Sequence, residues 1–189
     1  MSPHNNTINR SREAGRFWHG KSLVATRLSR TLSSSPETNM NKKIKQQLET
    51  LSGSPIPKEY EILVKHYPTE LKSLKASAGM KPFDCELFGN ANRILKVNAF
   101  VRSDGFDIFD DDGEPTTWPS RFLVIGEDGS GDYFAINLKR KKLAVFRWNH
   151  DSGQFENEAS SMKKYIHQIF RLYAELAIDD WNYSIHSAG

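Results

Sequence analysis

The sequence has a single cysteine, Cys85, and no apolar run that approaches the roughly 20 residues needed to cross a bilayer. One thiol can form neither an internal disulfide nor a metal site built from several cysteines. No compact apolar segment lies near the N-terminus, so no secretory signal is expected. These absences favour a cytoplasmic protein in a reducing compartment.

A positively charged folded domain is also missing. The net charge of the chain is +3, but residues 1–39 hold six basic and two acidic residues and so carry +4. The remaining residues therefore sum to −1. A nearly neutral domain argues against a general nucleic-acid binder.

Residues 1–39 are rich in Ser, Thr, Asn and Arg and show no sustained periodicity, which predicts a disordered segment. Two interpretations stay open. The composition matches an organellar transit peptide, or the start codon is assigned too far upstream. We favour the second because Met40 opens a stretch that resembles an ordinary N-terminus.

Residue patterns typical of enzymes are absent. The histidines after residue 40 are isolated in sequence and form no pair at metal-ligand spacing (His66, His150, His167 and His186). The glycine-rich stretch IGEDGSGD, residues 125–132, lacks the lysine of a phosphate-binding loop and carries Asp132 instead. It also lacks the G-x-S-x-G spacing of a nucleophile elbow. We therefore expect no enzyme, no catalytic residue and no cofactor.

One segment is strongly acidic. Its acids are Asp104, Asp107, Asp110, Asp111, Asp112 and Glu114. Such oxygens can hold calcium, but an EF-hand with Gly113 at its sixth position would place Ile108 and Pro119 where acids belong. A solvated loop is the favoured interpretation, and an enzyme that holds a divalent cation with these acids and Asp132 is the less favoured alternative.

The apolar pattern predicts helices first, then successive strands, then a closing helix. Helical spacing begins at Met40, resumes at Pro57 and continues through Leu71 and Leu74 to a Gly79 cap. Strands are expected at 86–88, 122–125, 133–138 and 143–148, whereas 93–101 suits either period. The closing helix is expected to begin near Ser160 or Ser161, and its apolar stripe is Tyr165, Ile169, Leu172, Tyr173 and Leu176. The order favours an α+β domain built on a mainly antiparallel sheet.

The stretch 125–136 is expected to be the bend of a hairpin. Gly126, Gly129 and Gly131 permit positive φ, and Asp128 followed by Gly129 is a hairpin signal. We expect Asp132 to hydrogen-bond across this turn.

Four stretches together resemble the SUKH superfamily, which joins fungal cell-wall regulators of the Smi–Knr type to bacterial immunity proteins. They are IPKEY (56–60), LFG (87–89), Trp118-Pro119 and FLVIGEDGSGDYFAI (122–136). The resemblance covers about 54–176, within an expected domain of 40–176 that is followed by a tail, 177–189. The chain departs from the family where Tyr67 runs into Pro68 instead of an Asn-Gly step, and 91–118 is hard to align.

The resemblance implies a protein-binding domain without an active site of its own. Bacterial members typically bind and block a toxin domain, whereas fungal members act as regulatory scaffolds, and we expect the first role. The expected partner surface is the acidic segment Asp104–Glu114 with Trp118, because acids steer a basic partner and an aromatic ring can anchor it. For Trp118 itself we favour the alternative that it caps the core. Neither a membrane nor a nucleic acid is an expected partner.

Overall fold

The computed structural model describes residues 40–77, 86–106, 108–109 and 113–187, with side chains described as far as residue 176. All of these residues belong to the unit of residues 35–189. The described helices are α1 (Lys42–Ser52), α2 (Lys58–Lys65), α3 (Thr69–Ser77), α4 (Ala91–Phe100) and α5 (Met162–Ser187). The described strands are β1 (Ile108–Phe109), β2 (Pro115–Thr116), β3 (Phe122–Glu127), β4 (Tyr133–Asn137), β5 (Val145–Trp148) and β6 (Phe155–Ala159).

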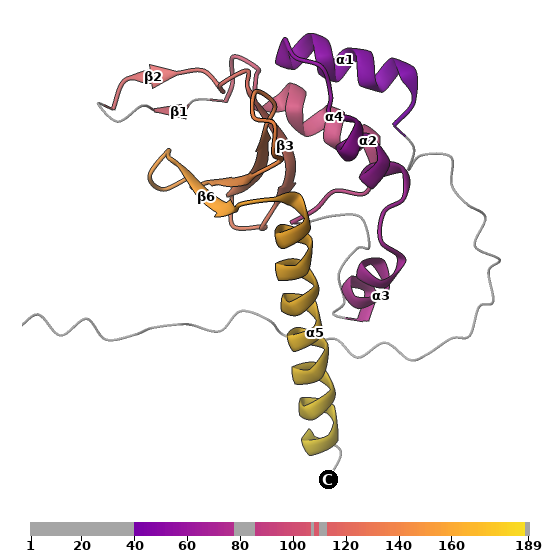
Figure 1. The fold of residues 1–189 in the computed structure, drawn as a ribbon. Coiled ribbons are helices and arrows are strands. Elements are labelled where there is room, and N and C mark those ends of the chain that lie inside the picture. The colour runs from indigo at the N-terminus through magenta and orange to yellow at the C-terminus, as the bar shows by residue number, and fades with distance from the viewer. Residues whose placement is uncertain (1–39, 78–85, 107, 110–112, 188–189) are drawn as a thin grey trace, which may run out of the picture. The chain divides into compact units, whose positions relative to one another are not determined.

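The strands form an antiparallel meander and a separate ribbon (Figure 1). The main sheet has the order β3-β4-β5-β6, and β1 pairs with β2. Helices before the sheet and a long helix after it confirm the α+β class with an antiparallel sheet.

Local sequence sets the bounds of the first helices. The side chain of Asn41 accepts a hydrogen bond from the Ile44 N–H at 3.0 Å and so caps the start of α1. Gly53 ends α1 with φ of 61°, a left-handed conformation that glycine adopts without strain. Pro57 lies at the N-cap position of α2, where its missing N–H costs nothing.

The two faces of the sheet are buried differently. Tyr133 and Trp148 pair across β4 and β5, and their rings are stacked at 5.9 Å on one face. Phe134 points to the opposite face, where its ring lies 5.4 Å from that of Tyr165 on α5. The sheet therefore lies between helices and a layer of aromatic side chains.

The outer edge of β3 is closed by α4 and by a segment before it. Asn98 binds the main chain of Val124, and the Phe88 N–H donates to the Ile125 carbonyl at 2.7 Å. Arg102 Nη2 donates to the Phe122 carbonyl at 2.6 Å. These contacts satisfy groups that an edge strand would otherwise present to other chains.

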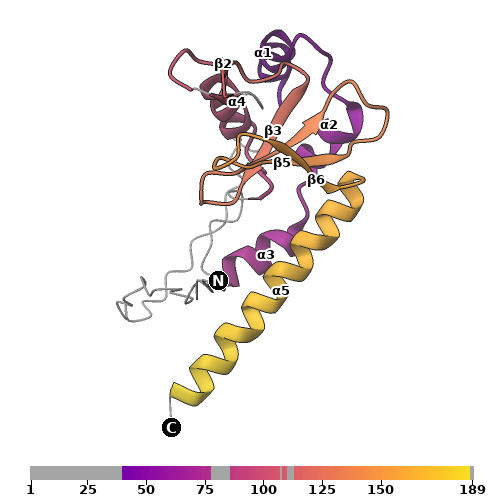
Figure 2. The ribbon, with the colours of Figure 1, turned by 90° about the vertical axis from the view of Figure 1, so that its left-hand side faces the viewer.

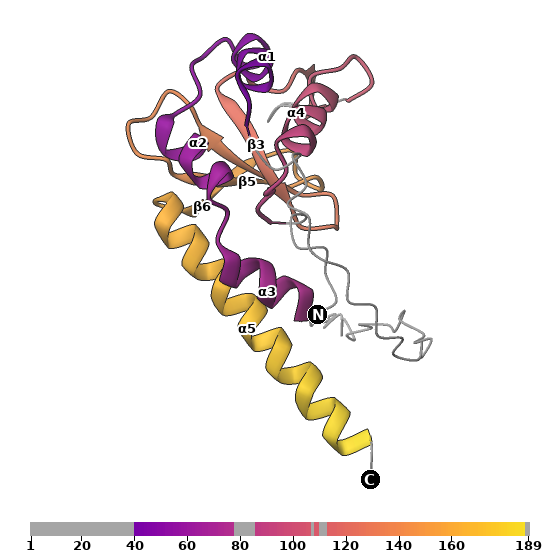
Figure 3. The same cartoon turned by 90° about the vertical axis from the view of Figure 1, so that its right-hand side faces the viewer.

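Glu86 joins the sheet to the last helix. The Tyr165 hydroxyl donates to the Glu86 carbonyl at 2.6 Å, and the Tyr173 hydroxyl donates to the Glu86 carboxylate. Helix α3 lies beside α5 (Figures 2 and 3), where Lys75 is buried above the Tyr173 ring, its Nζ 5.5 Å from the ring centroid. Glu86 and Lys75 therefore both contact the C-terminal helix.

The described elements decide some of the remaining expectations and correct others. The ambiguous residues 93–101 fall mainly in α4, and 86–88 contributes one hydrogen bond to β3 without forming a strand. Strand β6 was not expected, nor was the β1–β2 ribbon. The helix α5 continues to Ser187, through residues assigned to a tail. Gly79, the expected cap of α3, lies outside the described residues.

Candidate protein-binding surface

Two aromatic residues from between α4 and β3, Phe106 and Trp118, lie on the aromatic face of the sheet. The ring centroid of Phe106 lies 6.1 Å from that of Trp118, 5.9 Å from that of Tyr133 and 5.5 Å from that of Trp148. Trp118 is only 4% exposed, and its Nε1 donates to the Phe122 carbonyl at 2.9 Å. Of the two roles considered for Trp118, the structure places its ring in the core.

The β1–β2 ribbon lies between Phe106 and Trp118 in the sequence, and it overlaps the acidic segment. Asp104 and Glu114 are exposed at its two ends. Four of the expected partner-binding acids lie outside the described residues, namely Asp107, Asp110, Asp111 and Asp112. Of the acids in this segment, the structure therefore places Asp104 and Glu114.

Phe109 is the exposed aromatic residue of the ribbon, with 51% of its surface accessible, whereas its neighbour Ile108 is buried. A groove of about 420 Å³ separates the ribbon from the start of β6, and its lining includes Phe109, Arg121 and Phe155. Gly153 allows the close approach, because a Cβ there would lie 3.0 Å from the Phe109 carbonyl oxygen. The groove has a mixed lining, in which the rings of Phe109 and Phe155 lie beside polar groups of Thr116, Arg121 and Gln154.

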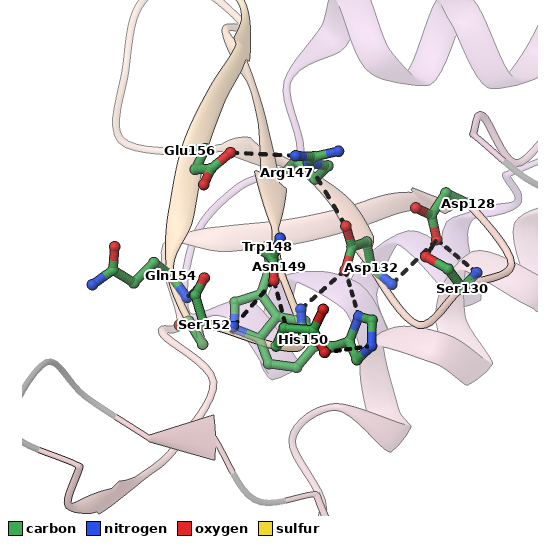
Figure 4. Close-up of polar contacts among 12 residues, drawn as sticks. Asp128, Ser130, Asp132, Arg147, Trp148, Asn149, His150, Ser152, Gln154 and Glu156 are labelled. Atoms are coloured by element: carbon green, nitrogen blue, oxygen red, sulfur yellow. Dashed lines mark hydrogen bonds and ion pairs between the residues drawn. The ribbon is translucent and has the colours of Figure 1, made fainter. Parts of the chain in front are cut away.

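The β3–β4 turn is held by Asp128. Its Oδ1 accepts hydrogen bonds from the Ser130 N–H at 2.8 Å and the Asp132 N–H at 3.2 Å (Figure 4). Asp132 hydrogen-bonds across this turn as expected, but with its main chain, because its carbonyl also accepts from the Asp128 N–H at 3.2 Å. The Asp132 carboxylate instead reaches the next loop, between β5 and β6.

Asp132 is a nearly buried carboxylate, 5% exposed, that binds His150 twice. Its Oδ1 accepts from the His150 N–H at 3.0 Å and from the ring Nδ1 at 2.7 Å, and its Oδ2 lies 3.7 Å from Arg147 Nε (Figure 4). Burial alone would raise the pKa of Asp132, but the hydrogen bonds from His150 and the charge of Arg147 outweigh it and lower that pKa. The same hydrogen bond raises the pKa of His150. The pair acts as a latch between two loops, and we call Asp132 and His150 the loop latch.

The three turn glycines have two different roles. Gly129 and Gly131 have φ of 82° and 119°, as the sequence predicted. Gly126 does not have a positive φ, which corrects its expected role. A Cβ on Gly126 would lie 1.8 Å from the Glu86 carbonyl oxygen, so this glycine leaves space for the main chain at 86–87. Pro119, which belongs to the Trp118-Pro119 stretch of the family resemblance, accepts a hydrogen bond at its carbonyl from the Phe122 N–H at 3.0 Å and leads the chain into β3.

Strand β6 forms the other edge of the sheet and was missed from the sequence. Its residues Phe155–Ala159 read FENEA, with acids at Glu156 and Glu158. Arg147 Nη2 lies 3.4 Å from Glu156 Oε2 across β5 and β6. The alternation that follows the turn at Asp151–Gly153 is the signal that would have identified this strand.

A metal-dependent reaction receives no support from the described side chains. In that part of the chain, no group of three or more His, Cys, Asp or Glu is placed to hold an ion. Asp132, assigned to the cation in that alternative, uses its carboxylate in the loop latch. Among the described helices, none is long and apolar enough to span a bilayer.

Comparison with known proteins identifies the family. The model of the SUKH_6 family, described as SMI1-KNR4 cell-wall, matches residues 42–166, from the start of α1 into α5. No match is found among the curated proteins or among the solved structures. The matched range contains the whole antiparallel sheet and the ribbon. The chain therefore belongs to the SMI1-KNR4 cell-wall family of the SUKH superfamily.

Proposed function

We propose that this chain is a non-enzymatic, cytoplasmic immunity-type protein that binds a toxin domain and neutralises it. The observation that carries the proposal is the family match over residues 42–166. Members of the SUKH superfamily are expected to be protein-binding domains. Such a domain needs a surface complementary to its partner rather than a set of catalytic residues.

The partner surface we propose is the acidic segment Asp104–Glu114 together with the adjoining groove. Asp104 and Glu114 are exposed, and Asp107, Asp110, Asp111 and Asp112 complete the acidic set in the sequence. Toxin domains that act on nucleic acid carry basic surfaces, and opposite charge accelerates their association with an acidic surface. Phe109, exposed on the ribbon, takes the anchoring role that was considered for Trp118.

The proposal predicts that a toxin is encoded beside this gene, and the test co-expresses that toxin with the chain and also uses it as purified protein. Co-expression should rescue growth. The variant Asp110→Lys/Asp111→Lys should associate with the toxin more slowly than the wild type at low salt, and the two rates should converge at high salt.

The matched control is Glu59→Lys/Glu70→Lys, which changes the net charge equally at exposed positions on α2 and α3. It should associate nearly as fast as the wild type. Equal association rates for both variants at low salt would place the binding surface elsewhere. Failure of the wild-type chain to bind the toxin or rescue growth would reject the immunity role.

The second candidate is a regulatory scaffold, favoured by the cell-wall description of the matching family. This role predicts stable capture of host proteins in the absence of any toxin. A toxin gene immediately beside this one, with rescue on co-expression, would decide against the scaffold.

A further inference from the structure

The two edges of the main sheet differ. Contacts from Asn98, Phe88 and Arg102 close the β3 edge. At the β6 edge, the Asn149 N–H donates to the Gln154 carbonyl at 3.0 Å, and Arg147 pairs with Glu156 two residues further along. Antiparallel pairing alternates, so the N–H and C=O groups of Phe155 and Asn157 point away from β5.

No hydrogen bond among the described residues engages the main-chain groups of Phe155 or Asn157 on this outer side. The next residue, Glu158, lies at the irregularity in the β5–β6 register, and its carbonyl is approached by Gln168 Nε2 of α5 at 3.5 Å. The free edge therefore runs from Phe155 to Asn157. We call these residues the β6 edge.

We infer that the β6 edge receives an extended basic segment of the protein partner, which adds to the sheet as a further strand. This inference rests on the proposed function, because it assigns the means by which the toxin domain is held. Strand addition supplies main-chain hydrogen bonds, and the side chains that alternate along the added strand supply selectivity.

Charge decides which kind of strand fits. Glu156 and Glu158 flank Asn157, and Asp151 lies in the preceding turn. A second copy of this chain, paired through the same edge, would bring glutamates against glutamates, and like charges across strands are unfavourable. A strand with Lys or Arg at alternate positions would meet these acids favourably. Arg147 lies 3.4 Å from Glu156, whereas no described cation forms an ion pair with Glu158.

The groove next to the β6 edge sets the other half of the pattern. Phe155 belongs to the aromatic face, where its ring stacks on that of Phe122 at 4.0 Å, and it lines the groove with Phe109 and Ile108. A side chain of the added strand on this face enters a groove where it can contact the two phenylalanine rings, although Thr116, Arg121 and Gln154 also line the groove. The expected partner sequence therefore alternates apolar residues, which face the groove, with basic residues, which face the glutamates.

A capped peptide of alternating lysine and valine is the probe, titrated into the ¹⁵N-labelled full chain and followed by NMR. We expect shifts concentrated at the amides of Phe155 and Asn157. Asn157→Pro removes the outward N–H without breaking a bond to β5 and should abolish these shifts, whereas Asn157→Ala should preserve them. A peptide methylated on alternate backbone nitrogens tests the same hydrogen bonds on the unchanged protein and should not bind.

Charge is tested separately. Glu156→Lys/Glu158→Lys should weaken peptide binding by about tenfold, because each attractive cross-strand pair becomes a repulsive one. Glu59→Lys/Glu70→Lys has the same net charge and should change binding by less than about twofold. Shifts centred on another surface, or undiminished binding of the methylated peptide, would overturn the inference.

Two further outcomes separate this inference from the proposed function. If the toxin is still neutralised by a folded Asn157→Pro chain, strand addition is wrong and the immunity role stands. If the chain rescues no toxin but the peptide binds the β6 edge as described, the immunity role fails and the edge remains a binding site for basic strands. A dimer of the wild type that Asn157→Pro dissolves would reassign the edge to a second copy and overturn the inference.

Discussion

Asn98 on α4 pairs with Val124 on β3 as a neighbouring strand would. Its Nδ2 donates to the Val124 carbonyl at 2.8 Å, and its Oδ1 accepts from the Val124 N–H at 2.9 Å. Arg102 Nη1 donates to the same Oδ1 at 3.0 Å. Asn98 is fully buried, so at Val124 one amide side chain takes the place of a partner strand.

Replacing Asn98 by leucine should destabilise the domain by about 3 kcal/mol or more, because the main-chain N–H and C=O of Val124 become buried without partners. Asn98→Asp keeps the acceptor but loses the donor, so it should also destabilise the fold. Urea denaturation monitored by circular dichroism measures both. A loss below about 1 kcal/mol for Asn98→Leu would show that β3 finds other partners or water.

Gly126→Ala should be far more damaging than Gly129→Ala. Gly126→Ala places a Cβ 1.8 Å from the Glu86 carbonyl oxygen. At Gly129 no atom lies within 4 Å of the added Cβ, so the strain there comes only from the positive φ of 82°. We expect a loss of about 3 kcal/mol or more for Gly126→Ala and about 1 kcal/mol for Gly129→Ala. Thermal unfolding of the two variants side by side checks the order, and a reversed order would contradict the packing at Glu86.

Asp132→Ala should cost about 2 kcal/mol, because it removes two hydrogen bonds from His150, one of them from the main chain. Asp128→Ala is the comparison. It loosens the exposed β3–β4 turn and should cost about 1 kcal/mol. Equal and negligible losses would mean that the two loops are held together by other contacts.

The loop latch should make stability depend on pH. The pKa of His150 is raised above its ordinary value of 6.5 by the hydrogen bond to Asp132. Its contribution is therefore complete below 6.5 and is lost as the pH rises through the folded-state value. The lowered pKa of Asp132 gives a contribution that is present above 3.8 and is lost as the pH falls through the folded-state value.

The difference in melting temperature between the wild type and His150→Gln should therefore be larger near about pH 5 than near about pH 8.5. The control His66→Gln removes an exposed histidine at the end of α2, outside the loop latch. It should leave the wild-type profile unchanged. A difference for His150→Gln that stays constant across this range would show that the ring acts without its charge.

The fold class was predictable because the apolar periods change along the chain from helical to alternating. The β3–β4 hairpin was equally clear, since Asp128 and Gly129 mark its turn. The role of Gly126 was not predictable, because the main chain that needs its space lies at residue 86, far away in sequence. Strand β6 was missed because its glutamates resemble a loop when the pairing with β5 is unknown.

The stripe on α5 was predicted in part. Tyr165, Ile169 and Tyr173 are buried, but Leu172 and Leu176 are 42% and 43% exposed. Helical spacing places all five along one side, yet sequence alone does not show how much neighbouring structure covers that side. Of the proposed partner surface, the sequence identified the acids, whereas the exposed Phe109 and its groove depend on contacts between distant segments.

The junction at Glu86 links the packing of the sheet to the docking of α5. Its carbonyl oxygen occupies the space above Gly126 and accepts from Tyr165, while its carboxylate accepts from Tyr173. The strands of the sheet can pair with one another before α5 docks, because none of them supplies these tyrosines. Until α5 docks, the 86–88 segment and α3 lack their closing partner, so a folding intermediate without docked α5 exposes apolar surface and is prone to aggregate.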